Sequence, residues 1–169
     1  MRHLLPLLLA FPFAAHAQAP GLVSVGAGAM DVLGSGTRTA ADLRLEYRAG
    51  LSLASFTDPL LAVRPWAGIE GTSRGAVWGG AGLLLDIPVG RFSFVPQAGV
   101  GGYDQGRGRN LGSVLEFRTG ADLAYRFLDG SRLAVAFTHT SNADIARRNP
   151  GMEGIVVNYQ IPLSWLLGP

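Results

Sequence analysis

The sequence predicts an all-β fold, an eight-stranded antiparallel transmembrane β-barrel, from three observations. Polar and apolar side chains alternate with a period of two in several segments. Eight such segments follow one another, and each is close to the ~9–11 residues that cross a bilayer at a tilt. Beyond residue 17 no apolar stretch reaches the length of a membrane helix, so any spanning structure must be a closed barrel.

The first segment of the chain has the pattern of an export signal. Arg2 and His3 precede an apolar run over residues 4–15, and Ala15-His16-Ala17 has the small-x-small pattern that signal peptidases cut. The run is too short to span a bilayer. We therefore expect residues 1–17 to be a signal peptide and residues 18–169 to form one barrel domain.

The strands are expected between turn-forming residues. Over residues 42–48 every even-numbered residue is charged and every odd-numbered residue is Leu or Tyr, and residues 116–127 alternate in a similar way. Opposite charges on several strands favour paired groups inside a narrow lumen over a soluble sandwich with its charges outside. The expected strands cover residues 21–32, 39–49, 60–70, 76–87, 91–102, 112–127, 131–141 and 153–164.

Turn lengths orient the barrel. Pro88-Val89-Gly90 and Leu128-Asp129-Gly130 are short joints after the fourth and sixth strands. Bacterial outer-membrane barrels keep short turns on the periplasmic side, where both termini of an eight-stranded barrel also lie. The connection over residues 142–152 is therefore expected to face outside.

Composition excludes several classes of function. Without Arg2, 13 arginines face 12 acidic residues, so no strong basic field indicates a nucleic-acid partner. The chain has no cysteine, and its single histidine beyond residue 17 does not make a ligand cluster. We expect no metal and no cofactor.

That histidine belongs to the most informative segment. His139 and Ser141 share the outward parity of the seventh strand, and Glu153 has the same parity on the eighth. An ionisable group on the lipid face is costly, so a purely structural barrel has no reason to place one there. The three residues supply a nucleophile, a base and an orienting acid for acyl transfer. Taken singly, they are read more simply as an interfacial histidine and turn-forming residues.

The pattern His139-x-Ser141-Asn142, a loop, and then Asn149-Pro150-Gly151-x-Glu153 resembles the signature of the PagL family of lipid A 3-O-deacylases. The resemblance implies an eight-stranded outer-membrane barrel that hydrolyses the ester-linked 3-hydroxyacyl chain at position 3 of lipid A. It implies a carboxylic ester hydrolase in which Ser141 is the nucleophile, His139 the general base and then acid, and Glu153 the residue that orients the histidine.

The same resemblance directs attention to Asn149 as an oxyanion donor, together with backbone amides near Ala143 and Asp144. The parity of Asn142 turns it inward, where it braces the end of the strand. Relatives are expected to have glycine at position 144, so the aspartate here is a departure. Another departure is that the chain continues past Trp165, where many such barrels end on an aromatic residue.

Partners follow from this assignment. Lipid A, or lipopolysaccharide, in the outer leaflet is the expected substrate, the bacterial outer membrane is the location, and pairing of barrels into a homodimer is left open. Arg147 and Arg148 are candidates for binding a lipid A phosphate, although loop arginines are more often only solvated. Trp66, Trp78 and Trp165 are read either as interface anchors or as ordinary packing.

Two alternatives remain at this point. One is a non-enzymatic outer-membrane barrel that stabilises the envelope or binds a ligand. The other is a soluble exported sandwich or lipocalin-like binder. The acyl-chain length preference, latency in the membrane and the identity of all oxyanion donors do not follow from the sequence.

Overall fold

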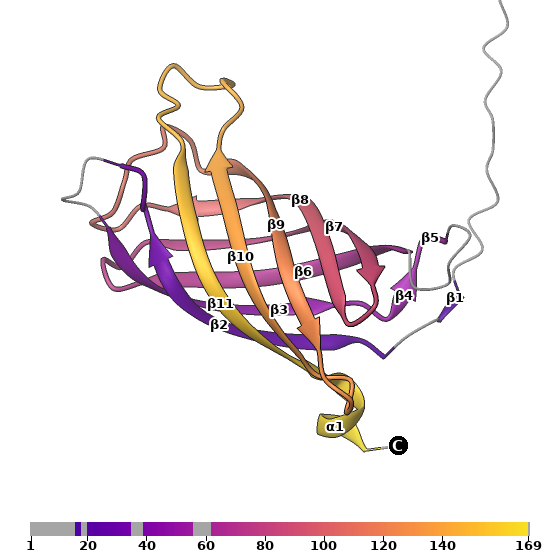
Figure 1. Ribbon diagram of the computed structural model, residues 1–169. Coiled ribbons are helices and arrows are strands. Elements are labelled where there is room, and N and C mark those ends of the chain that lie inside the picture. The colour runs from indigo at the N-terminus through magenta and orange to yellow at the C-terminus, as the bar shows by residue number, and fades with distance from the viewer. Residues whose placement is uncertain (1–15, 18–19, 35–38, 56–61, 169) are drawn as a thin grey trace, which may run out of the picture.

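The protein is a closed antiparallel β-barrel of eight long strands, as the alternation predicts. The computed structural model describes residues 16–17, 20–34, 39–55 and 62–168. Each long strand pairs with its neighbours in chain order, and the pairing of β2 with β11 and of β3 with β6 closes the ring (Figure 1). The strands are β2 (Leu22–Met30), β3 (Ala40–Arg48), β6 (Ala62–Thr72), β7 (Val77–Val89), β8 (Phe92–Asp104), β9 (Leu115–Arg126), β10 (Arg132–Ser141) and β11 (Met152–Pro162).

Within the described ranges, four short elements lie outside the ring. β1 (His16–Ala17) pairs with β4 (Leu51–Ser52), and β5 (Ala54–Ser55) pairs with the start of β6. The helix α1 (Leu163–Leu167) follows β11 at the end of the barrel opposite to the β10–β11 connection (Figure 1). Within the described residues, no helix has the length and apolar character needed to cross a membrane. Most of the expected signal peptide, residues 1–15, lies outside the described residues, as do residues 56–61.

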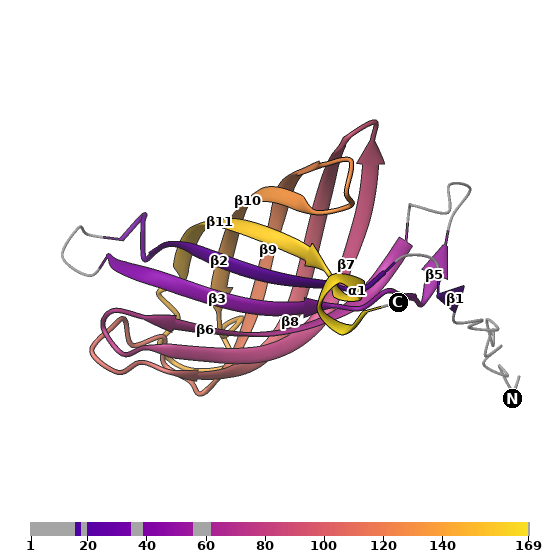
Figure 2. The ribbon, with the colours of Figure 1, turned by 90° about the horizontal axis from the view of Figure 1, so that it is seen from below.

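The alternation of the sequence becomes the inside and outside of the barrel. On β3 the four charged residues are buried, while Leu43, Leu45 and Tyr47 are 68%, 47% and 45% exposed. β9 repeats the pattern, with Arg118 buried and Leu123 exposed. The strands curve around a common interior in both views (Figure 2). The apolar exterior is the surface that a bilayer would cover.

Ion pairs fill the middle of the interior. The Glu70 carboxylate lies 2.6 Å from Arg44 and 2.9 Å from Arg118. Arg48 lies 2.6 Å from Asp122 and also contacts a glutamate on its own strand. Because these groups are almost fully buried, each depends on its partners for compensation of its charge.

Replacing Glu70 by alanine should destabilise the barrel. Arg118 would then have no carboxylate within ion-pair distance among the described residues. Breaking a buried pair from one side typically costs about 3–5 kcal/mol. Urea unfolding in lipid vesicles measures the change, with the exposed Asp104→Ala as the control. An unfolding midpoint that Glu70→Ala leaves unchanged would mean that the network adds nothing to stability.

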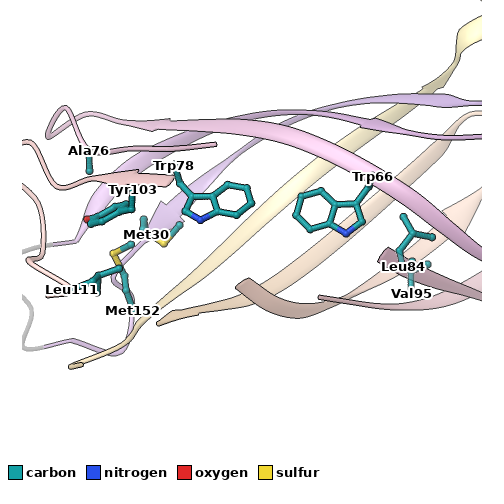
Figure 3. Packing of buried hydrophobic residues seen from close by; sticks show 9 residues of the cluster. All are labelled: Met30, Trp66, Ala76, Trp78, Leu84, Val95, Tyr103, Leu111 and Met152. Atoms are coloured by element: carbon teal, nitrogen blue, oxygen red, sulfur yellow. The ribbon is translucent and has the colours of Figure 1, made fainter. Parts of the chain in front are cut away.

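Two tryptophans pack inside the barrel beside this network. Trp66 and Trp78 are 2% and 1% exposed, and their rings stack at 5.9 Å between centroids (Figure 3). A Cβ at Gly99 or Gly101 would lie 2.7 Å or 2.8 Å from these indoles, so glycine makes room for them. The interface-anchor interpretation is therefore wrong for both residues and the packing interpretation is right. Trp165 on α1 is 51% exposed, so its anchoring role stays a prediction.

The connections sort into two ends. The strand ends that follow β2, β6, β8 and β10 lie at one end of the barrel, with the connecting residues 73–76, 105–114 and 142–151. The two-residue turn at 90–91 and the turn at 127–131 lie at the other end, with α1. The β10–β11 connection lies at the end opposite to the short turns, which we call the outer end because outer-membrane barrels keep their short turns on the periplasmic side; that it faces outside stays a prediction.

Candidate active site

The outer ends of β10 and β11 bring His139 and Glu153 face to face. The two residues are direct partners in the antiparallel register. They share the outward face with Phe137 and Ile155, each 45% exposed, so both side chains stand on the apolar exterior. The side chain of His139 is 43% exposed and that of Glu153 is 22% exposed. An ionisable pair therefore stands on the lipid-facing wall, close to its outer rim.

The pair is joined by a hydrogen bond. His139 Nδ1 lies 3.0 Å from Glu153 Oε1. When Nδ1 carries the hydrogen it donates to the carboxylate, and Nε2 is left with a free lone pair. This is the tautomer in which an imidazole accepts a proton from a nucleophile.

Ser141 lies two residues further along β10, on the same outward face. Same-face neighbours on a strand are about 6.5–7 Å apart at their Cα atoms. Among the described residues, the structure contains no hydrogen bond between the Ser141 hydroxyl and His139. The structure thus joins two of the three expected residues and places the third beside them. Nucleophile–base contacts in unliganded hydrolases are often long and tighten with substrate.

Gly151 packs against the imidazole, a contact that the sequence reading missed. Its φ is +65°, and a Cβ there would lie 2.6 Å from His139 Cε1. The backbone of the Asn149-Pro150-Gly151 turn therefore forms one wall of the histidine site. Glycine is required both for the left-handed backbone and for the close approach.

If His139 is the base that the sequence motif predicts, replacing Gly151 by alanine should lower kcat by about 100-fold, because an ångström of misplacement at a catalytic group has roughly that effect. The added methyl group would push the ring away from its place against Glu153. Gly90→Ala is the matched control, since Gly90 has φ +63° but open space around its Cβ position. Initial rates of the ester hydrolysis expected from the sequence motif measure the effect. Equal losses in the two variants would attribute the effect to backbone strain alone.

The backbone directly after Ser141 is held in a left-handed turn. Ala143 and Asp144 have φ values of +54° and +61°, and the Ile145 amide donates to the Asn142 carbonyl at 3.2 Å. Two consecutive non-glycine residues in this region are uncommon and are typical of functional sites. A glycine, as expected in relatives at position 144, would adopt this conformation without strain.

Two asparagines hold this loop. Asn149 Oδ1 accepts the backbone N–H of Asn142 at 3.0 Å, and its Nδ2 donates to Asp144 Oδ1 at 2.8 Å. Asn142 is buried, and its Nδ2 donates to the carbonyls of Leu111 and Arg148 at 2.8 Å and 2.7 Å. Asn142 thus has the inward, bracing position expected from its parity. Asn149 uses its amide within the loop, with one Nδ2 hydrogen left for another acceptor.

The β8–β9 connection supports the loop from the side. Arg148 Nε donates to the Asn110 carbonyl at 3.0 Å, and the backbone of Gly112, with φ +97°, lies against the Arg148 carbonyl. Arg147 is exposed, and no partner for its side chain is present in the described part of the chain. No sequence signal marked residues 110–112, because their contacts are to a segment more than 30 residues away.

Within the described residues, no group of three or more histidine and acidic side chains is placed to hold a metal ion. The chemistry available at this site is that of a hydroxyl, an imidazole and a carboxylate at a lipid-facing rim, with backbone amides in a tight turn beside them.

The chain is similar to known proteins in sequence and in fold. A family model described as lipid A 3-O-deacylase (PagL) matches residues 66–162, which is more than half of the chain and includes His139, Ser141 and Glu153. A solved structure described as the outer membrane enzyme PagL is similar at a TM-score of 0.62 and 21% identity, over 83% of this chain and 99% of that one. A structure from the de novo design of transmembrane β-barrels is similar at a TM-score of 0.56 and 14% identity, over 85% of this chain and 96% of that one. At these identities both structures support the fold alone. No curated protein sequence matches the chain.

Proposed function

The chain belongs to the PagL family of lipid A 3-O-deacylases, and on that premise we propose that it hydrolyses the ester-linked 3-hydroxyacyl chain at position 3 of lipid A through Ser141, His139 and Glu153. The family and the membrane β-barrel fold indicate the bacterial outer membrane. The observation that carries the proposal is the 3.0 Å contact between His139 and Glu153 on the outward face, at the outer rim. A substrate already in the outer leaflet reaches this face from the side and needs no pore.

The reaction begins with the Ser141 hydroxyl. Its oxygen attacks the acyl carbonyl while His139 Nε2 accepts the proton, and the Glu153 carboxylate stabilises the imidazolium that forms. The tetrahedral intermediate collapses to an acyl-serine, and the imidazolium gives its proton to the sugar 3-oxygen as it leaves. Water, deprotonated by His139, then releases the 3-hydroxy fatty acid and restores the serine.

The oxyanion has donors directly beside the nucleophile. The backbone amides of Ala143 and Asp144 lie in the left-handed turn that follows Ser141, and Asn149 holds that turn through its side chain. A preorganised donor of this kind is worth a few kcal/mol in the transition state. We assign the oxyanion site to these amides, with the free Nδ2 hydrogen of Asn149 as a further donor. Asn142 supports them through the strand end.

The loop arginines have different roles in this proposal. Arg147, exposed and without a partner in the described residues, is the better candidate for a lipid A phosphate. Arg148 uses its Nε on the Asn110 carbonyl, so it also stabilises the loop. Export through cleavage after Ala17 completes the proposal.

Purified protein in detergent, mixed with lipid A, tests this function. Mass spectrometry should detect one free 3-hydroxy fatty acid per lipid A and a matching loss of mass, with amide-linked chains retained. Fragmentation should assign the lost chain to position 3. Unchanged lipid A in the presence of folded barrel would leave the non-enzymatic barrel as the function.

A further inference from the structure

A second polar feature lies at the opposite rim of the barrel, far from the outward site. Arg91 in the β7–β8 turn and Arg126 at the end of β9 line an open hollow of about 370 Å³. The two residues are neighbours, since the Arg126 amide donates to the Arg91 carbonyl at 2.8 Å. Phe127, Leu128 and Gly130 of the β9–β10 turn complete the lining.

Within the described residues, neither arginine forms an ion pair. Among the described residues, their only side-chain hydrogen bond is that of 3.5 Å from Arg126 to the Gly90 carbonyl. Arg132, which lies opposite Arg126 in the register, instead pairs with Asp86 at 2.7 Å. The acidic residue of the turn, Asp129, accepts hydrogen bonds from the amide and hydroxyl of Ser131 at 2.9 Å and 2.7 Å. In the part of the chain that the structure describes, two arginines thus line one hollow and neither has a carboxylate as an ion-pair partner.

The surroundings of this hollow are apolar and aromatic. Phe92, Tyr125 and Phe127 form a row of edge-to-face rings, with centroids 5.3 Å and 5.2 Å apart. Phe92 is 52% exposed and Leu128 is 88% exposed. Rows of exposed aromatic rings mark the level of the membrane interface on barrels. The hollow therefore lies at the level where lipid headgroups meet the protein. Arg91 lines it from the exposed turn, whereas Arg126 has the inward parity of β9, opposite to that of Tyr125, and lines it from the end of the strand.

The C-terminal helix adds to this apolar rim. A Cβ at Gly130 would contact Pro162, so the β9–β10 turn lies beside the end of β11, directly before α1. On α1, Trp165, Leu166 and Leu167 are all exposed. A site for a soluble anion would need no such apolar border, whereas a lipid presents a phosphate together with acyl chains.

We propose that Arg91 and Arg126 bind the phosphodiester of an anionic glycerophospholipid in the periplasmic leaflet, with Leu128 and the aromatic row contacting its acyl chains. Arginine suits this ligand because its planar fork gives two parallel hydrogen bonds to phosphate oxygens. Two uncompensated positive charges favour a headgroup with net negative charge over a zwitterionic one. The bound lipid would hold the periplasmic rim of the barrel in its leaflet, independently of the outward chemistry.

Native mass spectrometry of the full chain in a neutral detergent tests the proposal, with phosphatidylglycerol, phosphatidylcholine and inorganic phosphate as probes. The intact chain should retain one phosphatidylglycerol in preference to phosphatidylcholine. Arg91→Gln combined with Arg126→Gln should weaken that binding by about tenfold or more. Arg107→Gln, which removes an exposed arginine from the outer end, should leave it unchanged.

Three results would overturn the proposal. The first is that the double variant retains phosphatidylglycerol as well as the intact chain does. The second is that Arg107→Gln loses as much binding as the double variant. The third is that inorganic phosphate displaces the bound lipid at the same concentration as added phosphatidylglycerol does. The single variant Arg91→Gln changes only an exposed turn residue, so it serves if the double variant does not fold. Heat-modifiable migration on a gel checks folding of each variant.

Discussion

Replacing Ser141 by alanine should reduce the rate of lipid A deacylation by about 10⁴-fold or more, because removal of the nucleophile of a hydrolytic triad has an effect of this size. The barrel should remain folded, since Ser141 lies at the end of β10 and the described residues give its side chain no hydrogen bond. Initial rates of 3-hydroxy fatty-acid release measure the loss. Heat-modifiable migration on a gel measures folding.

The structure supplies a matched control for this variant. Thr119 of β9 is the other register partner of His139. It is exposed, and it lies on the opposite side of His139 from Glu153 because β9 and β11 flank β10. Thr119→Ala should keep most of the activity. If Thr119→Ala abolishes the reaction and Ser141→Ala does not, the nucleophile has been assigned to the wrong neighbour of the histidine.

Replacing Glu153 by glutamine should lower kcat by about 10⁴-fold with little change in KM. The glutamine amide can donate to Nδ1, which moves the imidazole hydrogen to Nε2 and removes the lone pair that accepts the serine proton. The hydrogen bond of 3.0 Å to Nδ1 is what makes the effect large. Kinetics over a range of lipid A concentrations in mixed micelles separate kcat from KM.

A merely structural role for Glu153 would give a different result. It would lower the unfolding midpoint in urea and leave kcat of the folded fraction near that of the intact chain. We expect the reverse, with the midpoint retained and kcat lost. The kcat of Glu153→Asp should lie between that of the intact chain and that of Glu153→Gln, because aspartate keeps the charge but has a shorter side chain.

The strands and their inward and outward faces were predictable because a barrel wall imposes one simple rule on every strand. The charges of β3 are buried and its leucines exposed, as their alternation predicts. The same parity groups Trp66 with Arg64 and Glu70 on β6, so the inward position of Trp66 was available from the pattern. The anchor interpretation relied on residue type alone and overlooked it.

The site was predictable only in part. The shared outward parity of His139 and Glu153 was readable from the sequence, and the register of β10 and β11 places the two residues directly opposite each other. The support from the β8–β9 connection arises from contacts between segments distant in sequence, so no local pattern encodes it. The role of Gly151 depends on one contact with an imidazole, and a turn glycine by itself does not indicate that contact. The link from Ser141 to His139 stays a prediction.

Covalent trapping tests the central claim most directly. A long-chain phosphonate ester that reacts with activated serines should label the folded protein in detergent once and stop lipid A deacylation. Trypsin should then give the peptide of residues 133–147, in which Ser141 is the only serine, and fragmentation should place the adduct on it. Labelling should disappear in His139→Ala. The assignment of Ser141 as the nucleophile would be contradicted if the phosphonate inhibits the active protein while the adduct lies on another residue, or while Ser141 carries no adduct.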